Sequence, residues 1–328
     1  MRILVTGGAG YIGSHAVRLF LEHGHDVWVY DNLSFGHAEA VPAERLIVAD
    51  LAERERLSAV LREKQIEAVV HFAAFACVGE SVEQPFKYYR NNVTNTLILL
   101  ESMQSAGVSK IVFSSTCATY GVPLVSPITE ATPQQPINPY GRSKLVVEWM
   151  LADAARSFGL GYAALRYFNA AGAHPSGEIG EDHTPESHLI PLILQTIMGR
   201  REAIHVFGTD YPTPDGTCIR DYIHVDDLAV AHLIALERLQ PGKGLHLNLG
   251  TGRGYSVAEV IEVCEDVTQI KVKVIEGPRR AGDPPSLVAS ASQAREVLHW
   301  QPKYTDLRDI VETAWRWHRG HPKGYQTT

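Results

Sequence analysis

Cysteine is scarce in this chain, long apolar segments are missing, and basic charge is not in excess. The 328 residues include four cysteines, at positions 77, 117, 218 and 264, and no two of them form a Cys-x-x-Cys pair. We therefore expect reduced thiols in a reducing compartment. There is no apolar run of about 18 residues, and the apolar run at residues 3–5 is too short for a signal peptide. The sequence thus predicts a soluble cytoplasmic protein.

The charge balance argues against several classes of partner. Lys and Arg number 30 and Asp and Glu number 37, which gives a formal charge of −7. Such a balance disfavours general binding to nucleic acid or to anionic membranes. Hydrophobic residues make up 45% and charged residues 20%, near the averages of globular proteins. The composition excludes a disordered, collagen-like or coiled-coil chain, and the length allows one large domain or two intimate ones.

Short apolar runs alternate with helical patterns through the first half of the chain. Because these strands are apolar on both faces, we expect a parallel sheet covered by helices on both sides. The predicted fold class is α/β, a doubly wound parallel sheet of Rossmann type with a smaller mixed α/β lobe. The expected strands are residues 3–5, 27–30, 46–48, 68–72 and 110–113, and the expected helices are residues 14–22, 53–64 and a longer one after Pro85.

The pattern changes after about residue 173, where loop signals such as residues 174–177 and 211–216 appear. We expect residues 1–172, with about 221–250, to form the sheet domain. Residues 173–220 and 251–328 would form the lobe, which closes over the carboxyl edge of the sheet.

A glycine-rich turn joins the first expected strand to the first expected helix. Gly7, Gly10 and Gly13 give a GxxGxxG spacing within residues 6–13. Such glycines let the backbone approach a pyrophosphate, and the helix N-terminus then offers free N–H groups. The alternative is an ordinary glycine-rich turn, but the strand–turn–helix context favours a dinucleotide site.

Acidic residues follow the next two strands. Asp31 ends the second strand, and the following residues 32–34 contain no arginine. An acidic residue there can bind a ribose diol and repel a 2′-phosphate, which favours NAD over NADP. The alternative is a solvent-facing turn residue. Asp50 could lie near the adenine, or it could cap a helix.

Tyr140 and Lys144 stand at i, i+4 on an expected helix, so both side chains point the same way. A nearby ammonium would lower the tyrosine pKa, and such a tyrosine can take a proton from an alcohol. An ordinary surface pair is the alternative.

Three hydroxyls at residues 114–116 end the fifth strand, where ligands bind in parallel sheets. Thr116 is the favoured partner of Tyr140; simple capping is the alternative.

These residues carry a resemblance. The chain resembles the extended short-chain dehydrogenase/reductase superfamily in its first half and the nucleotide-sugar 4-epimerases in its second half, from Met1 to about residue 324. The motifs are TGGAGYIG at 6–13, HFAA at 71–74, FSSTCATYG at 113–121, YGRSK at 140–144, RYFNAAGAHP at 166–175, GEIGEDH at 177–183, HLIP at 188–191, FGTDYPTPDGTCIRDYIHVDDLA at 207–229, NLGTG at 248–252 and PRRAGDP at 278–284.

The resemblance implies an NAD-dependent 4-epimerase acting on UDP-galactose and UDP-glucose. Tyr140, helped by Thr116, would take the C4 hydroxyl proton while a hydride passes to tightly held NAD. Lys144 would hold the nicotinamide ribose and keep Tyr140 ionised. The 4-keto sugar would turn round, and the hydride would return to its other face. Members of the family are commonly homodimers through helices after Pro85 and around residues 140–156.

The resemblance also assigns binding residues. Arg220 and Arg280 would bind the diphosphate, Asp283 the uridine ribose, and Phe207 would cover the uracil. The implied cofactor-binding set is Gly7, Gly10, Tyr11, Ile12, Gly13, Asp31, Asn32, Asp50, Leu51, Phe72, Ala73, Ala74, Asn92, Ser114, Tyr140, Lys144 and Tyr167. The implied substrate-binding set is Thr116, Tyr140, Asn169, His188, Leu189, Phe207, Arg220, Tyr222, Arg280, Asp283 and Leu287.

Three positions depart from the family pattern. Ala76 stands where lysine is often found, and His188 replaces a common asparagine. Leu287 occupies the position that decides tolerance of a 2-acetamido group, so we expect UDP-galactose to be preferred and UDP-N-acetylgalactosamine to be accepted weakly. No metal site is expected, because the 15 histidines show no pair at ligand spacing near carboxylates.

Other functions stay open at this stage. One is a 4-epimerase of another UDP-sugar, such as a UDP-pentose, a UDP-uronate or an N-acetylated sugar. Another is a nucleotide-sugar 4,6-dehydratase, but that chemistry needs an acid/base pair where Cys117 and Ala118 stand. A non-catalytic NAD-sensing protein is disfavoured by the intact Thr116, Tyr140 and Lys144.

Overall fold

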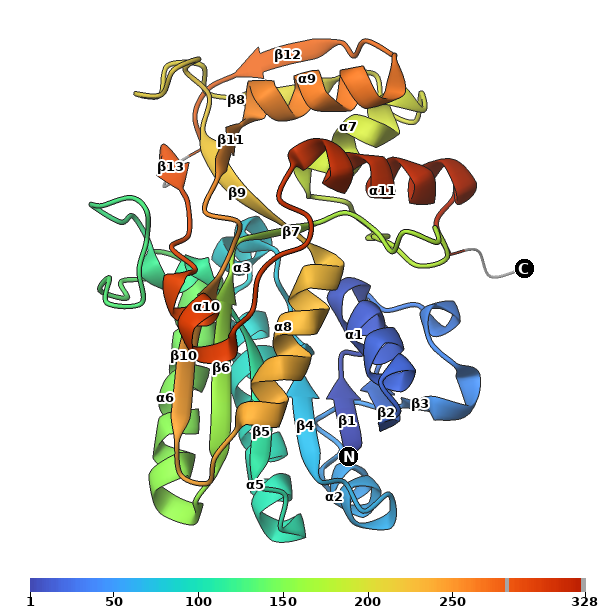
Figure 1. The fold of residues 1–328 in the computed structure, drawn as a ribbon, viewed down its shortest axis with the longest axis vertical. Helices are drawn as coiled ribbons and strands as arrows, with labels where there is room; N and C mark the ends of the chain where they lie inside the picture. The colour runs from blue at the N-terminus through green and yellow to red at the C-terminus, as the bar shows by residue number, and fades with distance from the viewer. Residues whose placement is uncertain (281–282, 326–328) are drawn as a thin grey trace.

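The larger part of the molecule is one seven-stranded sheet in the order β10-β6-β5-β4-β1-β2-β3, with every neighbouring pair parallel (Figure 1). The computed structural model describes residues 1–280 and 283–325. The predicted Rossmann-type fold class is confirmed. The strands of this sheet are β1 (Arg2–Thr6), β2 (Asp26–Asp31), β3 (Leu46–Val48), β4 (Ala68–His71), β5 (Lys110–Thr116), β6 (Gly161–Tyr167) and β10 (Gly244–Leu249).

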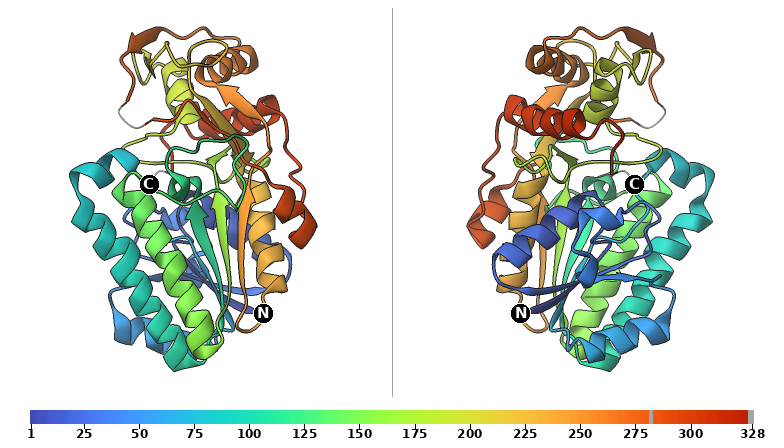
Figure 2. Two further views of the ribbon diagram at one scale, coloured as in Figure 1. Left: turned by 90° about the vertical axis from the view of Figure 1, so that its left-hand side faces the viewer. Right: turned by 90° about the vertical axis from the view of Figure 1, so that its right-hand side faces the viewer.

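Helices cover both faces of the sheet, and Figure 2 shows α5 and α6 on one side and α8 on the other. Successive side chains of a strand point to opposite faces, so Ile3 and Val5 of β1 join one core and Leu4 joins the other. Burying one such side chain contributes about 1.5–3 kcal/mol, and both faces gain in this way. One face carries α1 (Tyr11–Glu22), α8 (Val225–Arg238) and α10 (Ser292–Leu298), and the other carries α2 (Arg54–Glu63), α5 (Asn95–Ala106) and α6 (Pro139–Phe158).

Short helical segments connect these elements. They are α3 (Val78–Glu83), α4 (Pro85–Tyr88), the π-helical turn η3 (Tyr89–Thr94), and the 3₁₀ turns η1 (Ala38–Ala40), η2 (Ala43–Arg45) and η4 (Cys117–Tyr120).

A smaller lobe lies above the carboxyl ends of the sheet strands (Figure 1). Its central strand β9 pairs with β7, β11 and β13, and β8 pairs with β12. A third core fills the space between these strands and three helices. The lobe consists of β7 (Asn169–Ala171), β8 (Ile204–Phe207), β9 (Ile219–His224), β11 (Gly254–Ser256), β12 (Val274–Gly277), β13 (Ser286–Leu287), α7 (Leu189–Ile197), α9 (Val257–Thr268) and α11 (Leu307–Gly320).

The boundaries of the two parts differ from the expected ones at three places, one of which is β9, whose residues 221–224 were expected in the sheet domain but pair with lobe strands. Residues 251–328 were expected in the lobe, but α10 packs against α8 and β10 of the sheet domain. Ala294, Leu298 and Trp300 are buried in that first core, so the chain returns to the sheet domain once more before α11. In the other direction, β7 within the expected range 1–172 pairs with β9 and belongs to the lobe sheet. Ala281 and Gly282 of the PRRAGDP segment lie outside the described residues.

The described helices also bear on membrane association. Among residues 1–280 and 283–325, no helix combines the length and the apolar character needed to cross a bilayer.

Candidate functional site

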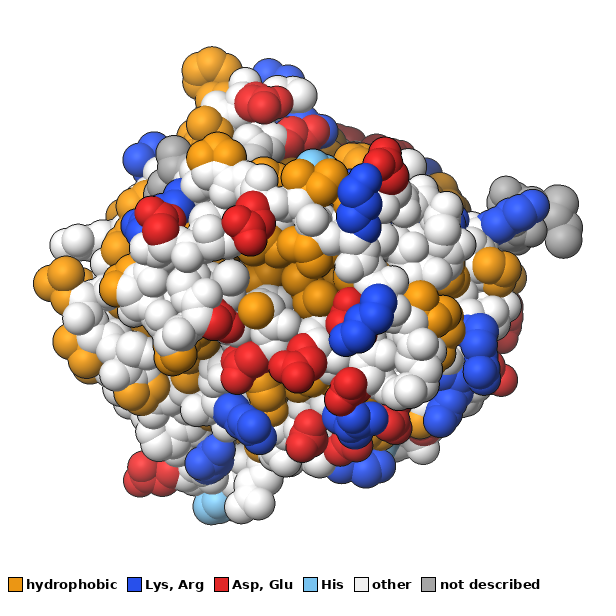
Figure 3. All heavy atoms as spheres, turned by 90° about the horizontal axis from the view of Figure 1, so that it is seen from above, with side chains coloured by type: hydrophobic (Ala, Val, Ile, Leu, Met, Phe, Trp, Pro, Cys, Tyr) orange, Lys and Arg blue, Asp and Glu red, His pale blue; other side chains and the backbone are white. Residues whose placement is uncertain are grey.

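A single large cavity separates the carboxyl edge of the sheet from the lobe. Its volume is about 1410 Å³, larger than the roughly 300–1,000 Å³ of a typical small-molecule pocket, so a dinucleotide and a second ligand can share it. All predicted site residues lie in the described ranges, and all but Asn92 line this cavity. At the lobe end of the molecule, basic and acidic side chains are interspersed (Figure 3), as the charge balance predicts.

The glycine-rich turn leaves no room for side chains. Gly7 has φ +71°, and a Cβ there would lie 2.4 Å from the backbone nitrogen of Ala73. A Cβ on Gly13 would lie 2.2 Å from the carbonyl oxygen of Gly7. Gly10 is the N-cap of α1 and offers no side chain to the first-turn N–H groups. These groups therefore stay available for a pyrophosphate, as predicted from the sequence.

Asp31 is fixed at the end of β2 by two backbone donors. Its Oδ2 accepts the N–H of Ala9 at 2.9 Å and its Oδ1 accepts the N–H of Leu33 at 2.8 Å. Burial raises the pKa of Asp31, and the two N–H groups oppose that shift. Asp50 lines the same end of the cavity, and its Oδ2 accepts a hydrogen bond from Asn32 Nδ2 at 2.7 Å. This acidic end of the cavity fits a ribose diol and disfavours a 2′-phosphate.

Helix α6 begins with a cap that sets its first turn against the cavity. Asn138 Oδ1 accepts the N–H of Gly141 at 2.8 Å, and Pro139 occupies the first helical position. Tyr140 and Lys144 follow on the same face and both line the cavity, as their spacing predicts.

The electrostatics of the Tyr140–Lys144 pair differ from the expectation. Burial raises the pKa of Tyr140 above its ordinary value, and a hydrogen bond with the Thr116 side chain opposes the shift. Lys144 Nζ donates to the carbonyl oxygen of Ser114 at 2.8 Å, and burial lowers the Lys144 pKa to about 7. The prediction that Lys144 lowers the pKa of Tyr140 is wrong for the chain by itself, because loss of hydration outweighs any contribution from a lysine aimed at a carbonyl.

Strand alternation sorts the three hydroxyls that end β5. Ser114 and Thr116 face the cavity, where the Ser114 hydroxyl hydrogen-bonds to the hydroxyl of Tyr167. Ser115 points to the other face and donates to Glu148 Oε1 at 2.6 Å inside the core. Thr116 Oγ1 also accepts the N–H of Ala118 at 3.1 Å. Thr116 therefore serves as a cap and still faces Tyr140, so the two interpretations of this residue are compatible.

Two arginines reach the cavity from the lobe. Arg220 of β9 donates to the carbonyl oxygens of Ile219 and Pro284 at 2.8 and 3.0 Å, and its Nη2 pairs with Asp283 Oδ1 at 2.6 Å. The Arg280 guanidinium lies 4.1 Å from the centre of the Phe207 ring. Planar guanidinium groups held in this way can meet a diphosphate with paired, charge-assisted bonds.

The remaining substrate-side residues come from four elements. Asn169 of β7 donates from Nδ2 to the carbonyl oxygen of Asp221 at 3.1 Å. Tyr222 of β9 lies opposite Asn169 in the strand register, and Leu287 of β13 lies opposite Arg220. His188 is the N-cap residue of α7, and Leu189 begins that helix. All of them line the cavity.

Asn92 is placed differently from the expectation. Its amide accepts the N–H of Phe75 at 2.9 Å and donates to the Phe75 carbonyl and the Ser143 hydroxyl, each at 3.0 Å. Asn92 is buried behind the cavity wall, where it positions the loop after β4 against α6. Ala76 of the same loop does line the cavity, with only a methyl group at the position where lysine is common.

Sequence reasoning missed several residues around the cavity. The turn after β2, including Phe35 and Gly36, lines the same end as Asp31, and Asn95 donates to Asp50 Oδ1 at 3.3 Å. Phe35 and Gly36 lie in an irregular turn, where no periodic pattern marks them, and Asn95 is the first residue of α5.

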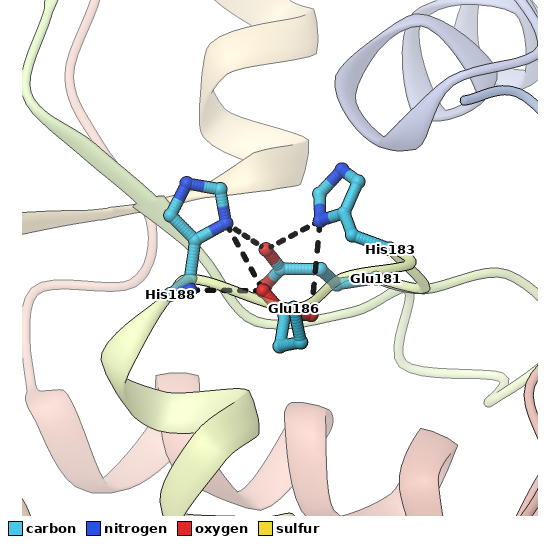
Figure 4. Close-up of side chains that lie close together, drawn as sticks. All are labelled: Glu181, His183, Glu186 and His188. Atoms are coloured by element: carbon cyan, nitrogen blue, oxygen red, sulfur yellow. Dashed lines mark hydrogen bonds and ion pairs between the residues drawn. The ribbon is translucent and has the colours of Figure 1, made fainter. Parts of the chain in front are cut away.

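The sequence analysis also missed that Glu181, His183 and Glu186, in the loop before α7, lie close to the predicted substrate-side residue His188 (Figure 4). This group shows that histidines do lie near carboxylates at short spacing. The alternation of glutamate and histidine over eight residues was the available signal.

The parallel sheet, the glycine-rich turn, the acidic end of β2 and the Tyr140–Lys144 pair at one cavity define an NAD-binding α/β enzyme. Residues 3–250 match the NAD dependent epimerase/dehydratase family, and the chain belongs to that family. NAD is therefore its cofactor.

Relatives agree over the whole chain. The UDP-glucose 4-epimerase of Halalkalibacterium halodurans is 53% identical over 328 residues, which cover 100% of this chain and 98% of that protein. The structure of the Brucella ovis UDP-glucose 4-epimerase in complex with NAD has a TM-score of 0.92 at 50% identity and covers 96% of this chain and 97% of that one. The Bifidobacterium longum UDP-glucose 4-epimerase in complex with NAD⁺ and UDP has a TM-score of 0.94 at 38% identity, with 99% and 100% covered.

Proposed function

We propose that this protein interconverts UDP-galactose and UDP-glucose by epimerisation at C4 of the sugar. One observation carries the proposal: Thr116, Tyr140 and Lys144 share a cavity with a dinucleotide turn and with two arginines that suit a diphosphate. The names of the relatives support the same reaction, and the solved relatives hold NAD or UDP.

Tyr140 is the proposed base for the C4 hydroxyl. When bound, NAD supplies the hydride acceptor and donor, together with a cationic ring whose charge favours an ionised phenol. Thr116 hydrogen-bonds to Tyr140 and stabilises the phenolate against burial. Lys144 donates one N–H to Ser114 and keeps two donors for a ribose. The same Tyr140 returns the proton when the other face of the sugar has reacted, because acid and base exchange roles between the two halves of the cycle.

The lobe is proposed to grip UDP while the sugar turns. Arg220 is already oriented by Asp283 and two carbonyl oxygens, so it loses little freedom on binding a diphosphate. Arg280 lies beside Phe207, which offers an aromatic face to uracil. With both anchors on UDP and none required on the sugar, the hexose can present either face to Tyr140.

Leu287 is proposed to set the sugar preference. It lines the cavity from β13 and packs beside Tyr120 and Phe168. A leucine leaves less space than cysteine or serine and more than tyrosine, so a 2-acetamido group would fit poorly. UDP-galactose is then the preferred substrate, and UDP-N-acetylgalactosamine a weak one.

A 4,6-dehydratase is disfavoured by the residues beside Thr116. Burial raises the pKa of Cys117 to about 12, so this thiol stays protonated and cannot replace the missing carboxylate pair. Ala118 has no titratable group.

Exposed apolar side chains suggest where a second copy binds. Phe86 of α4, Leu97 of α5 and Trp149 of α6 are exposed in this chain. We expect a homodimer through α5 and α6, tested by light scattering after size exclusion. A cytoplasmic location is proposed because all four cysteines, each in the described part of the chain, are unpaired thiols.

The central experiment is to incubate the purified protein with UDP-galactose and to follow the anomeric proton by NMR. Without added cofactor, conversion to a mixture with UDP-glucose is expected, because NAD is held and reused. The Tyr140→Phe variant is expected to bind NAD and to lose about 10²–10⁴-fold in kcat. No conversion by the wild type after NAD is supplied would contradict the substrate, and full turnover by Tyr140→Phe would contradict the assigned base.

A further inference from the structure

Four side chains with metal-ligand chemistry converge in the loop between β7 and α7 (Figure 4). Glu181, His183, Glu186 and His188 each bring one oxygen or nitrogen atom to the same place, and these four atoms all lie within 4.8 Å of one another. The Glu181 and Glu186 side chains are only 4% and 3% exposed, so both carboxylates are removed from water. Buried carboxylates require partners of opposite charge.

Three separations between histidine nitrogens and carboxylate oxygens are close to the edges of a tetrahedron, and they involve both oxygens of Glu186. His183 Nδ1 lies 3.3 Å from Glu181 Oε1 and 3.7 Å from Glu186 Oε2. His188 Nδ1 lies 3.6 Å from Glu186 Oε1 and also contacts Glu181 Oε1. Ligands bonded to a tetrahedral zinc ion at about 2.0–2.2 Å stand about 3.3–3.6 Å apart. Metal binding would require the direct His188–Glu181 hydrogen bond to open and one Glu186 oxygen to turn toward both histidines.

A second observation points to a missing ligand. Glu186 Oε2 and His183 Nδ1 are buried and have no hydrogen-bond partner among the described residues. Buried polar atoms are satisfied in the great majority of native structures, so two such atoms facing each other call for an explanation. An ion between them would satisfy both.

We propose that Glu181, His183, Glu186 and His188 form a binding site for a divalent transition-metal ion of the zinc type. Two imidazole nitrogens and two carboxylate oxygens favour zinc, cobalt or nickel over magnesium and calcium, which take oxygen ligands. The proposal does not depend on the reaction that the neighbouring cavity performs.

The site would fix one wall of that cavity. His188 is the N-cap residue of α7 and lines the cavity, while the His183 ring contacts the Tyr11 ring edge-on at a centroid distance of 6.1 Å. Glu181 is tied to α11 through its carbonyl oxygen, which accepts Trp317 Nε1–H at 3.0 Å. An ion would join the loop, the first turn of α1 and the start of α7 into one rigid unit.

The competing explanation is a metal-free ion-pair network. Although burial opposes the shift, Glu181 and Glu186 raise the pKa of His183 to about 10, and Glu181 also raises the pKa of His188. Two protonated histidines would neutralise two carboxylates, which gives the same net charge as one dication with neutral imidazoles. Charge balance alone does not distinguish the two states, so binding must be measured.

The test uses the full chain, freed of metal with a chelator and then titrated with Zn²⁺ by calorimetry and with Co²⁺ by visible absorption. We expect one ion per chain and the intense absorption of tetrahedral Co²⁺. Glu186→Gln and His183→Gln should each weaken binding by more than the roughly 10–100-fold loss typical of a supporting residue outside the ligand set. The control His174→Asn removes a histidine from the same loop outside the cluster and should bind as the wild type does.

Three results would overturn the proposal. One is no stoichiometric Zn²⁺ binding by the wild type. Another is a weak octahedral Co²⁺ spectrum of the wild type. This measurement uses no variant, so it remains decisive even if the variants fold poorly. The third is loss of binding in His174→Asn equal to that in Glu186→Gln, which would indicate adventitious binding to surface histidines.

Discussion

The buried pair of Glu148 and Arg166, which joins α6 to β6, offers a sharp test of how the cavity wall is stabilised. Arg166 of β6 reaches Glu148 of α6 with two N–H bonds of 3.0 and 2.6 Å, and the two side chains are 5% and 2% exposed. Ser115 and Gln134 donate to the same carboxylate at 2.6 and 3.1 Å. Glu148→Ala would therefore leave a buried guanidinium without its counter-charge and two donors without an acceptor.

Removing one partner of a buried pair costs about 3–5 kcal/mol of unfolding free energy. The same helix provides a matched control in Asp153, which pairs with Arg156 while the two side chains are 73% and 76% exposed. Exposed pairs contribute about 0–1 kcal/mol, so Asp153→Ala should leave stability nearly unchanged.

The assay is urea unfolding at saturating NAD, with midpoints compared among wild type, Glu148→Ala, Asp153→Ala and the double variant Glu148→Leu/Arg166→Met. The double variant should recover most of the loss, because neither charge remains buried alone. Despite burial, Arg166 depresses the Glu148 pKa, so this stability is present above the ordinary carboxyl pKa and is lost as pH falls below it. Equal midpoints for Glu148→Ala and Asp153→Ala at neutral pH would refute the reasoning.

Three further predictions concern the cavity itself. Thr116→Val removes the hydrogen bond that opposes the effect of burial on the Tyr140 pKa. We expect kcat to fall roughly 10- to 150-fold and the acidic limb of the kcat–pH profile to move to higher pH, whereas Thr116→Ser should retain activity. An unchanged acidic limb would argue against the Thr116–Tyr140 hydrogen bond. Gly13→Ala would place a Cβ 2.2 Å from the Gly7 carbonyl oxygen, so NAD affinity measured by fluorescence titration should drop, while Gly320→Ala, which meets nothing within 4 Å, should bind NAD normally. Leu287→Ser should raise kcat/KM for UDP-N-acetylgalactosamine and Leu287→Tyr should abolish it with UDP-galactose turnover kept; equal efficiency of the wild type on both sugars would contradict a role for Leu287 in selection.

The fold was predictable because its signal is local. Five strands of the sheet were expected from apolar runs such as residues 3–5, because burial on both faces favours that pattern, whereas β6, which contains Arg166, was not among the expected strands. The glycine-rich turn was equally readable, since only glycine fits where a Cβ would meet backbone atoms. The position of α10 was not predictable, because its few apolar residues contact a strand and a helix that the chain left earlier.

The candidate site was predictable residue by residue only where strand or helix geometry fixes direction. Alternation along β5 turns Ser115 into the core and Thr116 into the cavity. Asn92 lies on a π-helical turn, where neither the period of a helix nor that of a strand applies, and its amide is held by Phe75 and Ser143. The cluster of Glu181, His183, Glu186 and His188 lies in an irregular loop, so the alternation of glutamate and histidine could not by itself show that the four side chains converge.

The Tyr140–Lys144 pair shows where sequence spacing ceases to determine chemistry. The i, i+4 spacing brings both residues to the cavity, but the direction of each pKa shift comes from burial. With the Lys144 pKa lowered to about 7, the lysine is only partly charged at neutral pH and cannot by itself ionise a tyrosine whose pKa burial raises. We therefore expect an additional positive charge in the cavity to favour ionisation of Tyr140. Loading the cofactor should lower the pH at which Tyr140 ionises, and ultraviolet difference spectra of phenolate formation, read with Tyr140→Phe as the reference, would show that shift.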